Sequence, residues 1–425
     1  MKGYEAVAEA LRDCVDTVYT VPGYPVTEIG DCVSALMVTN EKTALEYALG
    51  DSLSGRRSCV IVKHVGMNAL CDPLLNATTQ GLVSGVVIIV GDDPEALFSQ
   101  NSQDSRYFGE LAQCPVIEPD RETLSAAVAA AFEASERFSR VAILRITPTL
   151  LNEDIQPVEA VQMIRHGRVA DRDLTIGGRI ARAEKGTAGL FAWAERSPLN
   201  RIKGGVVEIG VGAVGGESHI AIPYPPPSIP SGSRIIEIGR PFVREHQQLL
   251  PPQSGRSLER FTDRGFFRTF CRNCPFKPLF SLMKERKMQV IPDIGCSFLL
   301  MNPPYSLGIA SYCLGSSIAV AAQSTGVAVI GDGALLHSGI NSLIDCREKD
   351  IPLLVIVLAN SRMAMTGGQS VPDIAPYLSW ADPLEIPTED TEALSDALFI
   401  PETGQKVIIV RGRCPEEAAY EKVEC

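Results

Sequence analysis

The stretch from Gly331 to Gln369, GDGALLHSGINSLIDCREKDIPLLVIVLANSRMAMTGGQ, carries the pattern that decides the fold. Two apolar runs end beside small polar residues: GVAVI comes before Gly331-Asp332, and IPLLVIVLA comes before Asn360. Runs this apolar are typical of strands in a parallel sheet that is covered on both faces. We expect a crossover helix between them, beginning near Ser338.

Asp332 and Asn360 therefore fall at the carboxyl ends of two strands, where open parallel sheets bind ligands. Carboxylate and carboxamide oxygens suit Mg2+ or Ca2+, and Mg2+ commonly keeps one or two protein oxygens beside water and phosphate. Gly331 and Gly333 leave room for a phosphate at backbone N–H groups, and the following helix N-terminus favours an anion. A plain Gly-Asp-Gly turn is the alternative, but the spacing to Asn360 favours a metal–diphosphate site.

The same alternation of helix and strand fills residues 1–150 and 286–411. It predicts the α/β class, with two doubly wound parallel-sheet domains. The segment between them is polar and charged at first, then rich in proline and glycine, and it holds two short strand candidates near Val206 and Ile235. It is either a reduced middle domain or an elaborate linker. The predicted domains are 1–160, 161–262 and 263–425.

Composition excludes some functions. The 425 residues carry a formal net charge of −12, which argues against nucleic acid as a main partner. No apolar run is long enough to cross a membrane, and the first residues read as a helix and a strand, so we expect a cytoplasmic protein. Of the twelve cysteines, Cys271 and Cys274 alone form a close pair. Zinc would need a second pair nearby, and no ferredoxin-type run of four cysteines occurs.

The Gly-Asp-Gly…Asn spacing resembles the diphosphate–Mg2+ signature of thiamine-diphosphate (ThDP) enzymes, whose site is shared between two α/β domains. This resemblance implies that Mg2+ is bound by Asp332, by the side chain of Asn360 and by the backbone carbonyl of Arg362. Ala334 stands where the signature usually has a polar residue.

The segment NEKTALEYALGDSLSGRR, residues 40–57, resembles the part of ThDP enzymes that carries the activating glutamate, which places it at Glu41. Such a carboxylate hydrogen-bonds N1′ of the aminopyrimidine ring, and the resulting imino tautomer removes the C2 proton of the thiazolium. From the residue alone, Glu41 could equally stabilise the first turn of a helix.

Longer stretches, among them VPGYPVTEI, KHVGMNALCDPLLNATTQ, DIGC, LLHSGI and AMTGGQ, resemble the large subunit of indolepyruvate:ferredoxin oxidoreductase and together cover most of the chain. His64 and His337 lie in two of these stretches after predicted strands. Each could move a proton, anchor a substrate carboxylate or be purely structural. Besides the Gly-Asp-Gly…Asn residues, the resemblance implies cofactor contacts from Gly23, Gly295, Cys296, Met365 and Thr366.

That family decarboxylates aryl-2-oxo acids and passes electrons to ferredoxin through Fe–S clusters. The resemblance implies a homodimer, because such ThDP sites usually join two subunits. The sequence ends soon after the diphosphate domain, so we expect no C-terminal ferredoxin-like domain and an electron acceptor on a second subunit or Fe–S protein. Asn273 and Phe276 also depart from the family pattern. A non-oxidative decarboxylase of the sulfopyruvate or phosphonopyruvate type, and a ThDP-binding protein without turnover, remain alternatives.

Overall fold

The structure is a computed structural model that describes residues 1–155, 176–210, 217–238, 265–415 and 419–424. It divides into two compact units. Unit 1 contains Met1–Ala170 and Arg179–Phe261, and unit 2 contains Asp171–Gly178 and Thr262–Cys425. The predicted domain boundaries at residues 160 and 262 lie outside the described residues, so they stay predictions.

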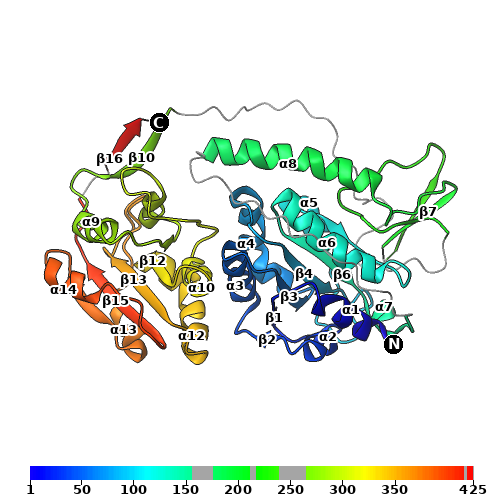
Figure 1. The fold of residues 1–425 in the computed structure, drawn as a ribbon, viewed down its shortest axis with the longest axis horizontal. Helices are drawn as coiled ribbons and strands as arrows, with labels where there is room; N and C mark the ends of the chain where they lie inside the picture. Colours follow the sequence, from blue (N-terminus) through cyan, green and yellow to red (C-terminus); the bar gives the residue numbers. More distant parts are fainter. Residues whose placement is uncertain (156–175, 211–216, 239–264, 416–418, 425) are drawn as a thin grey trace. The chain divides into compact units, whose positions relative to one another are not determined.

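Unit 1 is built on a six-stranded sheet with the order β2-β1-β3-β4-β6-β5, and all of its strands pair in parallel (Figure 1). Its central strands are almost continuously apolar and buried, as expected for a sheet covered on both faces. The strands are β1 (Thr17–Thr20), β2 (Leu36–Met37), β3 (Ser58–Lys63), β4 (Val86–Gly91), β5 (Val116–Ile117) and β6 (Ala142–Ile146).

Helices pack on both faces of this sheet. Cys59 and Ile61 of β3 join a core formed with α1 and α6, whereas the alternate residues Val60 and Val62 are buried on the face where α3 and α4 pack. The predicted doubly wound arrangement is therefore confirmed for unit 1. The helices are α1 (Gly3–Arg12), α2 (Thr27–Cys32), α3 (Glu41–Leu53), α4 (Gly66–Gln80), α5 (Tyr107–Ala112), α6 (Leu124–Phe138) and α7 (Pro148–Asn152).

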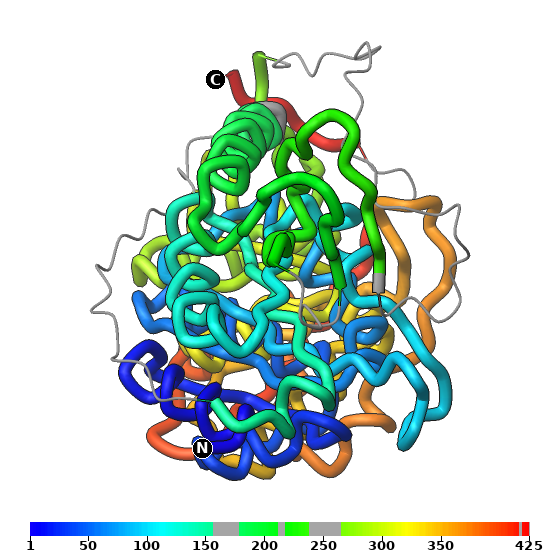
Figure 2. The backbone as a smooth tube through the Cα atoms, turned by 90° about the vertical axis from the view of Figure 1, so that its right-hand side faces the viewer, coloured from blue at the N-terminus to red at the C-terminus, as the bar shows by residue number. Residues whose placement is uncertain are grey.

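The middle segment adds helix α8 (Ile176–Arg196) and a small parallel sheet with the order β8-β7-β9. The strands are β7 (Val206–Gly210), β8 (His219–Ile220) and β9 (Arg234–Ile238), so both predicted strands are confirmed. Helix α8, green in Figures 1 and 2, lies against the end of α6: the rings of Phe138 and Trp193 are 6.1 Å apart.

The sequence pattern missed α8, because its glycines lower helix propensity. The packing explains two of them. A Cβ at Gly186 would stand 3.0 Å from Arg140 Nη2, and one at Gly189 would stand 3.2 Å from Phe138 Cε1. Close contact with Phe138 and Arg140 therefore favours glycine where an isolated helix would not.

Unit 2 is built on a five-stranded parallel sheet with the order β11-β12-β13-β15-β14, and an antiparallel pair, β10 with β16, is separate from it. The strands are β10 (Phe266–Cys271), β11 (Ile291–Pro292), β12 (Val327–Gly331), β13 (Leu353–Ala359), β14 (Leu384–Pro387), β15 (Gln405–Arg411) and β16 (Tyr420–Glu424). The predicted parallel sheet is confirmed, while β14 and the β10–β16 pair were not predicted.

The helical segments of unit 2 are short. They are α9 (Lys277–Glu285), the 3-10 turn η1 (Cys296–Met301), α10 (Ser317–Ala322), α11 (Asp332–Ala334), the π-turn η2 (Leu335–Gly339), α12 (Ile340–Glu348), α13 (Ala375–Leu378), the 3-10 turn η3 (Ser379–Ala381) and α14 (Thr391–Ala397). None of the helices in the described parts of the chain is long and apolar enough to span a membrane.

Two helix starts differ from the prediction. The sequence predicts a helix near 308–323, but α10 begins at Ser317. The backbone N–H groups of Gly315 and Ser317 donate to the buried Asp293 carboxylate at 2.8 and 3.0 Å and hold an irregular turn before the helix. The helix expected near Ser338 begins instead at Asp332, since α11, η2 and α12 follow one another without a break.

Candidate functional site

The structure brings Asp332 and Asn360 together at the carboxyl ends of β12 and β13, which are neighbours in the sheet. Asp332 Oδ2 accepts hydrogen bonds from the backbone N–H groups of Asn360 (3.1 Å) and Ser361 (2.7 Å). The predicted juxtaposition therefore exists, and it ties the start of the helical run to the loop after β13.

Asp332 is a buried carboxylate without a cationic partner among the described residues. Its side chain is 4% exposed, and its bonded neighbours are backbone N–H groups, including that of Gly333 at 2.8 Å. Burial raises the pKa of Asp332, which those N–H groups only partly offset. A bound divalent cation would supply the missing positive charge, so this observation fits Mg2+ at the site.

The Asn360 side chain is held at both ends. Its Oδ1 accepts the backbone N–H of Arg362 at 3.0 Å, and its Nδ2 donates to Cys414 Sγ at 3.1 Å. The Asn360 side chain and the backbone that follows it therefore form one turn. Asn360 Oδ1 and the carbonyl oxygen of Arg362 both lie on this turn and could bind the same ion. The other two predicted metal ligands, Asn360 and Arg362, therefore lie in one turn that is hydrogen-bonded to Asp332.

The two glycines of the Gly-Asp-Gly stretch have different surroundings. A Cβ at Gly331 would meet nothing within 4 Å, whereas one at Gly333 would stand 2.5 Å from Met363 Sδ. Gly331 therefore leaves an open approach beside Asp332, which suits a bulky anion, and Gly333 is required for packing against the loop that follows Asn360.

A cavity of about 220 Å3 lies next to this loop, entirely within unit 2. Three predicted residues line it: Cys296, Asn360 and Arg362. Met365 and Thr366 lie on the same loop but are exposed and outside the lining. The other lining residues are Phe270, Cys271, Cys274, Pro275, Phe276, Ala364, Gly367, Gly368, Cys414, Pro415 and Tyr420.

Several of these lining residues were not predicted. Tyr420 belongs to β16, which pairs with β10, and its partner Cys271 lies 149 positions earlier in the sequence; Cys414 follows β15. Local periodicity in a sequence does not predict that segments so far apart lie together in the fold. The short apolar alternation before Cys271 was the one signal that could have indicated β10.

Gly295 and His337 complete the predicted residues of unit 2. Gly295 has φ 123°, a left-handed conformation that favours glycine, and it precedes η1, where Cys296 begins the turn. His337 lies in η2 and is exposed; its Nδ1 is 3.1 Å from Ser338 Oγ. It is therefore accessible, while its role stays a prediction.

Glu41 begins helix α3 in unit 1, as predicted, and Asn40 caps that helix by accepting the N–H of Thr43 at 2.9 Å. The Glu41 side chain lies against Gly66 at the start of α4, where an added Cβ would stand 2.7 Å from Glu41 Cγ. Among the described residues its carboxylate forms no hydrogen bond or ion pair. It is thus positioned by packing and left available to a ligand.

His64 follows β3 and is fully buried. Its Nε2 lies 3.1 Å from Asn101 Oδ1, and Gln103 donates to its backbone carbonyl at 3.0 Å. Its Nδ1 is buried without a hydrogen-bond partner among the described residues. Gly23, the remaining predicted residue, lies against the stem of Lys63: an added Cβ would stand 3.1 Å from Lys63 Cβ.

Comparison with known proteins is consistent with this site. Residues 292–397, which include Asp332 and Asn360, match the family described as "Thiamine pyrophosphate enzyme, C-terminal TPP binding domain". The indolepyruvate oxidoreductase subunit IorA of Methanothermobacter thermautotrophicus is 26% identical over 487 residues, covering 88% of this chain and 76% of that protein. The IorA subunit of Pyrococcus abyssi is 24% identical and covers 97% and 85%.

A solved structure shows the same fold. The thiamine diphosphate-dependent 4-hydroxybenzoylformate decarboxylase of Rhodococcus jostii RHA1 superposes with a TM-score of 0.60, at 16% identity, over 98% of this chain and 100% of that one. The sequence and fold comparisons agree with the parallel-sheet architecture of both units. The chain therefore resembles thiamine-diphosphate-dependent enzymes and, over most of its length, the IorA subunits.

Proposed function

We propose that this chain binds thiamine diphosphate through Mg2+ and decarboxylates a 2-oxo acid of the aryl-pyruvate type, as part of an oxidoreductase. One observation carries the proposal: the buried Asp332 carboxylate, without a cationic partner among the described residues, is bonded to the loop that begins at Asn360. The relatives support the substrate class, because their names describe indolepyruvate oxidoreductase subunits.

In this proposal the oxygens of Asp332 and Asn360 and the carbonyl of Arg362 would hold Mg2+. Gly331 leaves space for the diphosphate. When bound, the coenzyme would supply a nucleophilic carbon. Glu41 would hold a proton at N1′ of the aminopyrimidine, because its carboxylate forms no hydrogen bond or ion pair among the described residues.

His64 is the better of the two histidine candidates for holding a proton near the substrate. Its buried Nδ1 lacks a partner among the described residues, so a ligand atom would satisfy it, whereas His337 is exposed beside Ser338. Magnesium, a homodimer, an electron acceptor on a second subunit and a cytoplasmic location are further predictions from the sequence.

Calorimetric titration with ThDP tests the cofactor assignment. We expect binding in the presence of Mg2+ and much weaker binding after the cation is removed with a chelator. A protein that takes up no ThDP under either condition would contradict the proposal.

Glu41→Gln tests whether the Glu41 carboxylate activates the aminopyrimidine ring of ThDP. We expect ThDP binding to be retained, while CO2 release from a 2-oxo acid falls by about 100-fold or more, since a positioned acid or base contributes that much. Glu133→Gln, an exposed carboxylate on α6, is the matched control and should leave both unchanged. Full turnover by Glu41→Gln would show that another residue activates the coenzyme.

Product analysis separates an oxidoreductase from a decarboxylase. Indolepyruvate and phenylpyruvate are supplied with and without an artificial electron acceptor. CO2 release that requires the acceptor supports the proposed activity, and aldehyde formation without it shows non-oxidative decarboxylation instead. Bound ThDP with no CO2 under any condition would indicate a binding protein without turnover.

A further inference from the structure

The buried ring of His64 is held by the segment that follows β4, residues 93–103. His64 Nε2 lies 3.1 Å from the side-chain oxygen of Asn101 and 3.2 Å from the backbone carbonyl oxygen of the same residue. Gln103 donates to the backbone carbonyl of His64 at 3.0 Å. Two residues of one segment therefore fix both the ring and the backbone of His64.

These contacts determine which ring nitrogen carries the hydrogen. A backbone carbonyl oxygen can only accept a hydrogen bond, so His64 Nε2 is the donor to Asn101. In a neutral imidazole the other nitrogen then has no hydrogen and is an acceptor. His64 Nδ1 is that acceptor, and it is buried without a hydrogen-bond partner among the described residues.

The acceptor at His64 Nδ1 suits one class of ligand group. A buried acceptor without a donor lowers stability, and a ligand with an O–H or N–H group would remove that cost. A carboxylate would instead place a second acceptor against the lone pair of Nδ1. The Asp93 carboxylate, which interacts electrostatically with His64, would also repel a second negative charge there.

The segment around Asn101 is itself fixed, so it can support the ring. Asp93 accepts the backbone N–H group of Phe98 at 3.0 Å. Gln103 and Asn68 of α4 exchange two side-chain hydrogen bonds, at 3.0 and 3.1 Å. Asn101 is therefore attached to the rest of unit 1 on both sides.

His64 also lies near the carboxylate predicted to meet the coenzyme. It follows β3, two residues before α4 begins at Gly66, and the Glu41 side chain packs against Gly66. Both protonable groups are thus at the same end of the unit 1 sheet. A ligand that reaches Glu41 is expected close to His64 as well.

We propose that Asn101 is a positioning residue that keeps the hydrogen of His64 on Nε2, so that Nδ1 accepts a hydrogen bond from an O–H or N–H group of the bound ligand. The identity of that ligand, ThDP or the substrate, rests on the proposed function, whereas the tautomer is a property of the free chain. His64 then holds a proton acceptor at the site and is not an anchor for the substrate carboxylate.

Nuclear magnetic resonance of the free chain with 15N-labelled histidine tests the tautomer, because a ring nitrogen with a hydrogen has a different 15N shift from one without. Spectra are recorded at about pH 8, where imidazole is ordinarily neutral, and His64→Gln assigns the His64 signals. We expect the hydrogen on Nε2 and none on Nδ1. Asn101→Ala should lower the fraction of His64 with a hydrogen on Nε2, and Asn101→Asp, which keeps an oxygen acceptor, should restore it.

Asn76→Ala, at an exposed asparagine on α4, is the matched control and should leave the His64 signals unchanged. Asn101 is exposed too, and circular dichroism checks that its variants remain folded. A hydrogen on Nδ1 of His64 in the native chain would overturn the proposal. Identical His64 signals in Asn101→Ala and the native chain would overturn it as well.

His219 on β8 is an internal control for the ligand. Its ring is buried in the same arrangement: Nε2 is 3.3 Å from the Glu118 carbonyl oxygen, and Nδ1 has no hydrogen-bond partner among the described residues. If burial alone made such a nitrogen respond to added compounds, both histidines would respond. We expect a ligand to change the Nδ1 shift of His64 and not that of His219.

Two ligands separate the sources of the donor. ThDP with Mg2+ supplies the N–H group of its aminopyrimidine, and phenyllactate supplies an O–H group at the carbon where a 2-oxo acid has its oxo group. Phenylpropionate has the carboxylate but no hydroxyl, so it should not change the Nδ1 shift of His64. An equal change with phenylpropionate, or no change with ligands that calorimetry shows to be bound, would overturn the proposal. A chain that binds no ThDP contradicts the proposed function, while the ligand-free spectra still decide the tautomer.

Discussion

Buried carboxylates lie at the carboxyl ends of both parallel sheets, but their surroundings differ. In unit 1, Asp92 follows β4 and its Oδ2 lies 2.6 Å from Arg145 Nε, while Arg145 Nη1 lies 2.8 Å from Glu118 Oε2. In unit 2, Asp293 follows β11 and Asp332 begins the helical run after β12, and no described Arg or Lys forms an ion pair with either.

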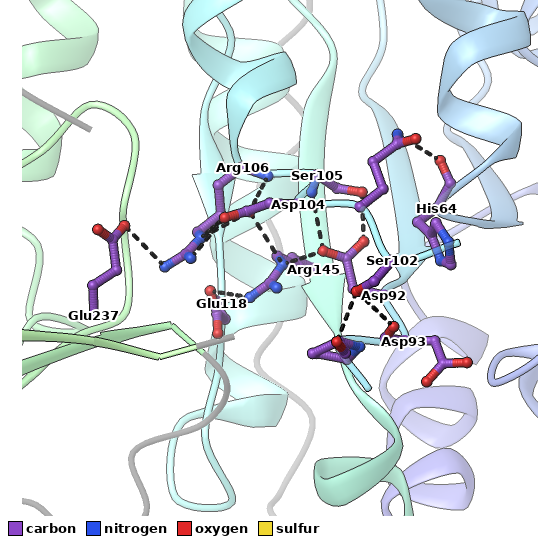
Figure 3. Close-up of polar contacts among 12 residues, drawn as sticks. His64, Asp92, Asp93, Ser102, Asp104, Ser105, Arg106, Glu118, Arg145 and Glu237 are labelled. Carbon is purple, nitrogen blue, oxygen red and sulfur yellow. Dashed lines mark hydrogen bonds and ion pairs between the residues drawn. The ribbon is translucent and has the colours of Figure 1, made fainter. Parts of the chain in front are cut away.

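The buried charges in unit 1 form what we call the Arg145 cluster. Figure 3 shows the cluster with its member Glu237 at one side, while His64, which is not a member, lies at the other. Arg106 joins it through Asp104, at 2.7 Å, and through Glu237, at 3.6 Å. The remaining members are Asp92, Glu118 and Arg145. The cluster holds the segment from Asp92 to Arg106, and Asn101 and Gln103 of that segment contact His64.

The comparison separates two uses of a buried charge. A carboxylate that already has its arginine is satisfied in the free protein, so its main effect is on the structure. A carboxylate that is held by backbone N–H groups alone can still bind a cation, but burying its charge without one lowers the stability of the free protein. The predictions below test this distinction.

Arg145→Met should have the largest effect. It leaves Asp92 and Glu118 buried without their cation, and we expect a loss of about 3–5 kcal/mol in the free energy of unfolding, measured by urea denaturation. Adding Asp92→Asn to this variant should recover part of the loss. A loss below about 1 kcal/mol would show that the cluster is not structurally required.

Asp293 should make stability depend on pH in the opposite sense to a paired carboxylate. Burial raises its pKa to about 6, from a usual value near 3.8, so the folded chain keeps a proton that the unfolded chain has lost. The stabilisation is complete below about pH 4 and is lost as the pH rises through 6, a change of roughly 3 kcal/mol. Asp293→Asn should flatten this part of the pH profile, whereas an unchanged profile would contradict the assignment.

Asp332→Asn should affect ligand binding more than folding. It removes the negatively charged group that would bind the cation. We therefore expect calorimetry to show that the Mg2+-dependent affinity for ThDP falls about 100-fold, or about 2.7 kcal/mol. Because the pKa of Asp332 is raised, protons should compete with Mg2+ in the native chain as the pH falls through that pKa. Unchanged affinity in the variant would mean that the cation is bound elsewhere.

Glu133→Gln should have the smallest effect. The Glu133–Arg137 pair lies on the surface of α6, with both side chains more than half exposed, at 59% and 56%. Solvent screens such pairs, so we expect a change of about 0.3 kcal/mol in the free energy of unfolding. A change as large as that of Arg145→Met would show that burial is not what distinguishes the two pairs.

Much of the sheet architecture could be predicted from sequence. Strands such as β4 and β13 are short, apolar and bounded by polar residues, and that pattern is typical of covered parallel strands. The meeting of Asp332 and Asn360 follows from the same rule, because parallel strands end at the same edge of a sheet.

The features that the sequence did not predict depend on contacts between segments that are distant in the sequence. Helix α8 is stabilised by packing against Phe138 and Arg140, which its own glycine-containing sequence does not reveal. Cys296 and Cys414 become neighbours of Cys271 only through β10, η1 and the end of β15. The burial of His64 likewise results from Asn101, 37 positions later.

The pairing of β10 with β16 has a consequence for biosynthesis. Tyr420 lies in the last described strand, and its partner Cys271 is made about 150 residues earlier. Translation proceeds from the amino terminus, so most of the unit 2 sheet can form on the ribosome before the cavity has its final wall. A nascent chain stalled before Tyr420 would therefore leave the thiol of Cys271 open to reagents, and labelling of such stalled chains would show the cavity closing last.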